Sequence, residues 1–236
     1  MKRHETLYIS LDAESHFPEV GSSFSHYAIR KAPQKGMPTK VYTGTNESSI
    51  LLDNNVFYLP NDFCALSMSI HRKVIFSWPN KLGVKWDYVT CHNIKLRTSD
   101  TLSKTKTDVH RYPVFHTNRQ IWWSSIQQEW AGLPKVMWTR SGYTKPFFDE
   151  GELGGTDMVY YVPVRSAIEG EHLVNNLNTR IMKYILRTAR WSGFGNEKVF
   201  RALPALPVDH SLSDPEAFEF FGLSDEEVQF VDGLLG

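Results

Sequence analysis

The sequence predicts an α+β fold, in which an N-terminal β-hairpin segment precedes a mixed strand and helix domain that closes with short C-terminal helices. Three observations support this class. Apolar runs separated by turn residues occupy the N-terminal region, a helical apolar period runs from Glu169 to Trp191, and two capping-box sequences follow it. With 236 residues, of which 41% are hydrophobic, the chain can bury a substantial core.

The first 45 residues are predicted to form a β-hairpin followed by a connector. Apolar-rich runs span 6–11, 16–20 and 24–31, with a turn at Gly21 to Ser23. Residues 31–48 are rich in Pro, Gly, Ser and Thr, a composition typical of a connector. We therefore expect a boundary near residues 33–48, which divides the chain into 1–45 and 46–236.

The middle of the chain is predicted to mix helices, strands and one polar loop. The apolar spacing of residues 63–75 favours a short helix, and alternation in 73–78 and 85–100 favours strands. Residues 98–108 offer little to bury and read as a loop that carries Lys104 and Lys106. Residues 119–132 place apolar side chains at helical spacing and end at Gly132, which predicts a helix.

The last hundred residues begin with a predicted strand pair and end in helices. Residues 134–143 and 154–164 read as paired strands around a long Gly-rich loop. The period from Glu169 to Trp191 predicts one long helix. The capping boxes predict two short helices, packed through apolar side chains; the boxes are Ser213 with Glu216 and Ser224 with Glu227, and the packing residues are Phe218, Phe221, Val228 and Phe230.

Charge is distributed unevenly along the chain, although the net charge is zero. Arg72 to Lys145 holds thirteen Lys or Arg against four Asp or Glu, a net of +9, while residues 1–71 carry −1 and residues 146–236 carry −8. A concentrated positive field suits a polyanion, because each neutralised phosphate releases counterions. The alternative is a solvated face that the acidic C-terminal third balances after folding. Nucleic acid is therefore the first partner to test.

Other classes of protein find little support in the sequence. It has no run of eighteen apolar residues and its start lacks the apolar core of a signal peptide, so we expect a cytoplasmic protein without a membrane partner. Cys64 and Cys91 are expected to be buried free thiols. Nucleotide-loop, nucleophile-elbow and zinc-helix motifs are absent, and no metal or cofactor is expected in this chain.

Several segments resemble the C-terminal, target-recognition part of adenine-N6 DNA methyltransferases of type II restriction-modification systems. HFPEVGSSFSHYAIRKAP is similar to the end of their catalytic domain, where a strand hairpin leads into the recognition region. Residues 134–164 look like their strand, loop and strand, residues 172–209 like their recognition-domain helix and Leu-Pro exit, and residues 218–233 like their closing helices. The resemblance covers most of the chain in short, degenerate motifs.

The chain departs from this family in the chemistry that the family performs. Those enzymes bind S-adenosylmethionine at a Gly-bearing strand end and transfer the methyl group at an Asn or Asp followed by Pro-Pro and an aromatic residue. Neither motif is present; the nearest candidates, 77–80 and 59–61, lack paired prolines. The resemblance therefore implies a module without methyl transfer of its own, with S-adenosylmethionine bound by a catalytic partner subunit.

The resemblance further implies that double-stranded DNA is the ligand, since such enzymes extrude their target base while a separate domain reads the flanking bases. It places the loop after Trp138 on the DNA, with Arg140 and Tyr143 as the first candidates. Phe24 or Tyr27 would stack the extruded base, although core packing of these rings is the alternative. The full set of predicted DNA contacts is Lys104, Lys106, Arg111, Asn118, Arg119, Arg140, Ser141, Tyr143 and Lys145.

A rival interpretation from another class stays open. The basic face could instead dock an acidic protein, which would make the chain a non-enzymatic interaction protein of an anti-restriction kind. The two interpretations differ in salt dependence, because DNA binding weakens steeply with salt and docking through an apolar centre does not.

Overall fold

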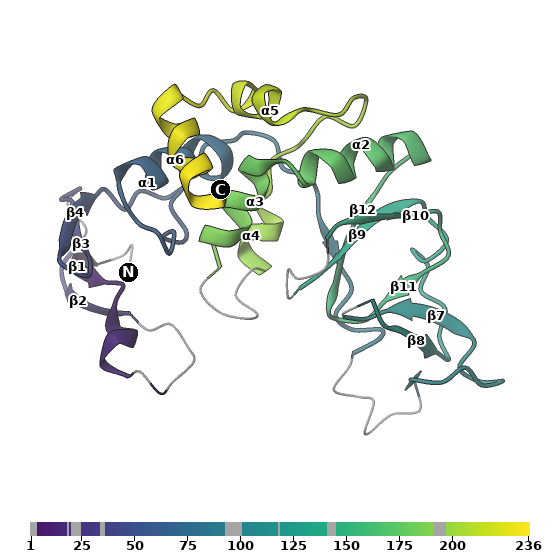
Figure 1. Cartoon of the computed structure of the whole chain (residues 1–236). Coiled ribbons are helices and arrows are strands. Elements are labelled where there is room, and N and C mark those ends of the chain that lie inside the picture. Colours follow the sequence, from purple (N-terminus) through teal and green to yellow (C-terminus); the bar gives the residue numbers. More distant parts are fainter. Residues whose placement is uncertain are drawn as a thin grey trace.

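The computed structural model describes residues 4–17, 19, 25–33, 36–92, 101–117, 119–140, 145–190 and 197–236. The described chain has the α+β fold that the sequence predicts, with three four-stranded sheets and a group of helices. Figure 1 shows an N-terminal sheet at one end, most of the helices in the middle, and the other two sheets at the opposite end.

The N-terminal sheet has the strand order β2-β1-β3-β4. β1 (Glu5–Ser10) pairs antiparallel with β2 (His26–Arg30), so the predicted hairpin pairing is confirmed. A 3-10 helix, η1 (Ala13–His16), lies between the two strands. The predicted strand at 16–20 is wrong at its start, because His16 ends η1, and the predicted turn at 21–23 lies outside the described residues.

The predicted connector at 31–48 is wrong from residue 39 onward. There β3 (Thr39–Thr43) pairs with β4 (Asn46–Ile50) around Gly44, whose φ of 59° suits the left-handed turn position. Ser and Thr tolerate a strand when one face is buried, and here Val41 and Ile50 supply that face. The N-terminal sheet extends to Ile50, so the expected division after residue 45 falls inside the hairpin of β3 and β4.

The predicted short helix at 63–75 is confirmed as α1 (Ala65–His71), which continues through one π-helical turn, η2 (Arg72–Phe76). Cys64 caps α1, its sulfur accepting from the Ser67 backbone N–H. The strand predicted at 73–78 is wrong because Val74 to Phe76 belong to η2 and are all buried, a pattern that fits a buried strand equally well. Of the strand predicted at 85–100, β5 (Lys85–Trp86) is confirmed, residues 87–92 do not form a strand, and residues 93–100 lie outside the described residues.

The second sheet has the order β10-β9-β12-β5. β9 (Lys135–Thr139) pairs antiparallel with β12 (Val159–Pro163), which confirms the predicted strand pair. The predicted Gly-rich loop between them contains β10 (Phe147–Asp149) and the short β11 (Gly154–Gly155). That loop therefore contributes strands to two sheets rather than joining β9 to β12 alone.

The third sheet has the order β11-β7-β8-β6 and replaces the helix predicted at 119–132. Its strands are β6 (Leu102–Ser103), β7 (Tyr112–Phe115) and β8 (Ile121–Ser124), together with β11. Along β8, burial alternates between exposed Ile121, buried Trp122, half-buried Trp123 and buried Ser124. Two adjacent tryptophans favour a strand, and the apolar spacing that resembled a helix was misleading because it mixed a strand with the turn after it.

The predicted long helix is two helices, α2 (Ala167–Leu177) and α3 (Arg180–Thr188). The break lies at Thr179, whose backbone is extended, and the Arg180 N–H that opens α3 donates to the Asp214 carboxylate at 2.7 Å. After α4 (Glu197–Arg201), α5 (Asp214–Phe220) and α6 (Asp225–Leu235) begin at the two predicted capping boxes, which are both present. A tertiary contact thus decided the break, whereas local sequence decided the caps.

One apolar core joins the N-terminal sheet, the helices and the second sheet. α3 lies at its centre, since Ile181, Met182, Tyr184 and Ile185 are fully buried. The opposite side of α3 carries exposed Lys183 and Arg187 and half-buried Leu186. The core therefore fixes the orientation of this cationic side.

Candidate nucleic-acid interface

The basic segment from Arg72 to Lys145 does not form one open positive face. Four of its cations pair with carboxylates, and Lys81 donates to the carbonyls of Ile75 and Trp78. The four pairs are Arg72 with Asp53 at 2.7 Å, Lys73 with Glu227 at 2.6 Å, Lys135 with Asp149 at 2.6 Å and Arg140 with Glu197 at 3.9 Å. Folding therefore neutralises part of the positive field that the sequence concentrates there.

Arg140, the first predicted base reader, belongs to a shared ion-pair network. Glu197 lies 3.9 Å from Arg140 and 3.1 Å from Arg201, and both guanidinium groups lie over the Trp86 ring, at 5.4 and 5.8 Å. Burial first, and then Glu197, raise the pKa of the neighbouring Tyr160 hydroxyl. Ser141 and Tyr143, predicted beside Arg140, lie outside the described residues.

Three predicted contacts lie at the third sheet, on both of its faces, and each has its charge over an aromatic ring. Lys104 lies 5.8 Å from the centre of the Trp122 ring, Lys106 lies 5.0 Å from Trp123, and Arg111 lies 5.2 Å from Tyr112. All three cations are exposed, so the rings orient them without removing them from solvent.

Arg119 lies at the tip of the hairpin between β7 and β8, and neighbouring Asn118 is outside the described residues. Its φ is 61°, a left-handed conformation that is costly for a residue with a side chain. The exposed Arg119 side chain and Lys145 help to line a hollow of about 330 Å³ beside Pro146 and Phe147. The strained turn thus carries a cation into a concave surface.

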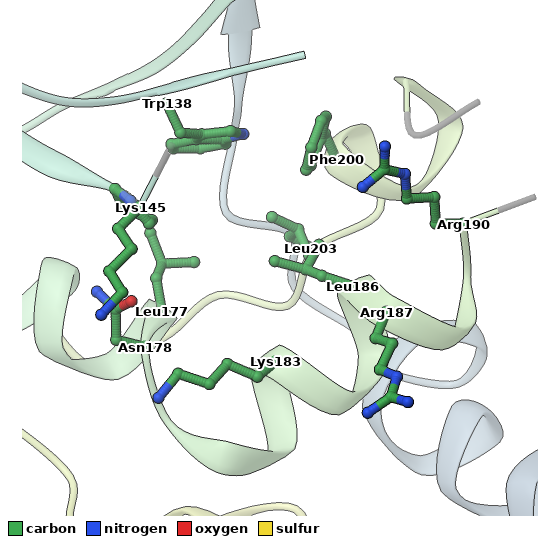
Figure 2. A pocket seen from close by; sticks show the side chains of 11 residues that line it. Trp138, Lys145, Leu177, Asn178, Lys183, Leu186, Arg187, Arg190, Phe200 and Leu203 are labelled. Atoms are coloured by element: carbon green, nitrogen blue, oxygen red, sulfur yellow. The ribbon is translucent and has the colours of Figure 1, made fainter. Parts of the chain in front are cut away.

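A second hollow, which we call the α3 pocket, has a volume of about 400 Å³ and lies between the end of β9, α3 and α4. Figure 2 shows apolar side chains on one side and long cationic side chains around it. The apolar part is Trp138, Leu177, Leu186, Phe200 and Leu203; the cations are Lys145, Lys183, Arg187 and Arg190; Pro146 and Asn178 complete the described lining.

Lys145 and Pro146 line both hollows, so the two hollows are adjacent. Their described lining contains five cations and no carboxylate. We call the two hollows together the cationic groove. Predicted residues Arg119 and Lys145 lie in it, whereas Arg140 lies in the network around Glu197.

Sequence reasoning missed Lys183, Arg187 and Arg190. Their spacing of four and three residues places them on one side of a helix, which was a readable signal. They were overlooked as site residues because the C-terminal third has a net charge of −8. Many of its carboxylates lie in α5, α6 and their caps, and none is among the described lining of the groove.

Of the two residues predicted to stack the extruded base, the one that the structure describes lies away from this groove. Phe24 is outside the described residues, and Tyr27 lies on β2, at the end of the molecule opposite the third sheet (Figure 1). Tyr27 is 52% exposed, so the alternative that it packs in the core is wrong. Any stacking by Tyr27 stays a prediction for a complex with a partner.

The described residues contain no cluster of three His, Cys, Asp or Glu side chains that could hold a metal ion. His116 instead stacks on Trp122 at 3.8 Å and shares a hydrogen bond with the Thr156 hydroxyl, and burial lowers its pKa. Cys91 is a buried free thiol as predicted, while Cys64 is free but only half-buried. None of the helices in the described ranges is long and apolar enough to cross a membrane.

Comparison with known proteins gives no family assignment: no protein-family model and no curated protein matches this chain.

Proposed function

We propose that this chain is a DNA-binding target-recognition module that works in the cytoplasm with a separate adenine-specific DNA methyltransferase subunit. The observation that carries the proposal is the cationic groove, in which five cations line two adjacent hollows whose described lining includes no carboxylate. A concave wall of one sign focuses the field on a passing polyanion, and each phosphate contact releases counterions.

The groove combines two kinds of cation that suit different parts of duplex DNA. Lys145 and Lys183 are flexible point charges that suit phosphates. Arg119, Arg187 and Arg190 carry planar forks that can bind a phosphate or a guanine edge in bidentate fashion.

The partner subunit in this proposal supplies what the chain lacks in sequence, namely the S-adenosylmethionine site and the methyl-transfer motif. The chain alone is then expected to bind DNA without methylating it. Incubation with DNA and labelled S-adenosylmethionine tests this, and methyl incorporation without a second protein would contradict the division of labour. Affinity capture from the native host tests the partner, which should carry the missing motifs.

The decisive experiment for DNA binding is a salt titration of duplex affinity by fluorescence anisotropy. Five phosphate contacts predict a log–log slope of about −4 to −5, since each contributes about −0.9. A matched control is Lys40→Ala, which removes an exposed, Glu47-paired lysine on β3 and should leave the slope unchanged. A slope near zero, or no duplex binding, would instead favour the interaction-protein interpretation.

A further inference from the structure

We infer that the α3 pocket receives a single nucleotide, with the base on the apolar wall and the phosphate among the surrounding cations. This inference rests on the proposed function but goes beyond it, because holding a DNA backbone needs positive charge and does not need an apolar hollow. The chemistry recognised is a flat apolar body joined to a phosphate, either a free nucleotide or one unstacked nucleotide of a strand.

The apolar wall of the pocket is rigid. Trp138, Leu177, Phe200 and Leu203 are each at most 4% exposed and belong to the main core, while half-buried Leu186 presents part of its side chain to the opening. A volume of about 400 Å³ lies within the range of small-ligand sites, which are commonly about 300 to 1,000 Å³. The wall therefore offers a preformed surface for a body the size of a nucleoside.

The cations at the mouth of the pocket are held in place from outside it. Arg187 donates through Nη1 to the Leu234 carbonyl at 2.7 Å, which anchors its planar fork. The Asn61 side-chain amide donates to the carbonyls of Arg187 and Arg190 at 3.1 and 2.9 Å, and so fixes the last turn of α3. Lys145 and Lys183 reach the mouth from the other side (Figure 2).

A polar side chain on the wall distinguishes this hollow from a purely apolar packing defect. Asn178 uses one amide N–H on the Val174 carbonyl at 2.8 Å, and an amide at the edge of a pocket suits the hydrogen-bonding edge of a base.

The test compares ligands that share the phosphate and differ in the base. The full chain is titrated by calorimetry with deoxynucleoside monophosphates and with inorganic phosphate. In parallel, anisotropy compares a fully paired duplex, the same duplex with one bulged nucleotide, and a duplex whose bulge is abasic. We expect the base to strengthen binding at least tenfold in one of these two series. Tighter binding of the monophosphates than of inorganic phosphate identifies a free nucleotide as the ligand. If only the bulge series shows tighter binding with the base than without it, the ligand is an unstacked nucleotide of a strand.

Two variants localise the effect. Leu186→Trp fills the pocket while keeping every cation, and should remove the tenfold preference for the base. Lys183→Glu reverses an exposed charge at the mouth and leaves the core untouched. It should weaken binding at least tenfold in both series, so it replaces Leu186→Trp as the test if Leu186→Trp lowers the melting temperature. Lys40→Ala should change neither series.

The inference is wrong if the base strengthens binding in neither series, or if folded Leu186→Trp still binds more tightly when the base is present. Steep, salt-dependent binding of the paired duplex in that case would leave the proposed function standing. Absence of paired-duplex binding would overturn the proposed function itself.

Discussion

Arg140 and Lys145 lie five residues apart, on either side of the connection from β9 to β10, yet they have opposite surroundings. Arg140 shares Glu197 with Arg201 and covers Trp86, whereas Lys145 faces Lys183 and the apolar wall of the α3 pocket (Figure 2). The comparison shows that nearness in sequence does not give two cations the same role. What matters is whether another element brings a carboxylate to them, as α4 brings Glu197.

The largest expected effect comes from removing groove cations. The triple variant Lys145→Ala, Lys183→Ala, Arg187→Ala should lower duplex affinity at 150 mM salt by about a hundredfold or more and make the salt slope shallower by about 2.7, since three contacts are lost. All three side chains are exposed, so the melting temperature should fall only slightly, through the lost hydrogen bond from Arg187 to the Leu234 carbonyl. An unchanged slope would show that the groove is not where the phosphates bind.

The second prediction concerns the frame that holds α3. His71 is buried between the Tyr58 hydroxyl at 2.6 Å and the Thr188 hydroxyl of α3 at 2.8 Å, and burial lowers the pKa of His71 to about 3. The stability that neutral His71 contributes is fully present above its unfolded pKa of about 6.5. It is lost as pH falls towards 3, because the unfolded chain then binds a proton at His71 that the folded chain does not bind.

Denaturant unfolding should therefore show a loss of up to about 1.4 kcal/mol per pH unit between pH 6 and 4 from this group. His71→Gln removes the titration while keeping a hydrogen-bonding side chain. It should be less stable than the wild type at pH 7 and should lose less stability on acidification. Parallel pH profiles for the two proteins would exclude His71 as the cause.

Arg140→Ala tests the other side of the comparison. If Arg140 leaves Glu197 to read a base edge, its loss should cost about 1 to 3 kcal/mol on the recognised sequence and little elsewhere. Equal losses on all sequences would assign it to phosphates. Glu197→Gln is the matched variant, because it releases Arg140 and Arg201 from their shared carboxylate and should strengthen duplex binding; weaker binding would show that Glu197 positions these arginines for contact.

The smallest expected effect is at Arg119. Glycine adopts a φ of 61° without steric cost, so Arg119→Gly should leave stability unchanged or raise it by up to about 1 kcal/mol. The same change removes a groove cation and should weaken duplex binding several-fold, with the salt slope shallower by about 0.9. Arg119→Lys keeps both charge and strain and should bind nearly as the wild type. A stable variant with full affinity would remove Arg119 from the interface.

The correct structural predictions rested on short-range signals. The capping boxes at Ser213 and Ser224 involve residues three apart, and the β9–β12 pair consists of two apolar runs bounded by turn residues. The wrong structural predictions depended on contacts between residues that lie far apart in the sequence. Residues 121–124 form a strand because β7 and β6 pair with them, and the long helix breaks at Thr179, where Asp214 receives the Arg180 N–H.

The sequence by itself determined the α+β class, the cap positions, the central strand pair and the uneven charge, since these follow from residue type and local spacing. Only the tertiary structure decided which cations face solvent together. It paired Arg140 with Glu197 and set Lys145 beside α3 residues from the acidic third of the chain. Electrostatic fields add in space and not along the chain, so the groove could not be read from segment charges alone.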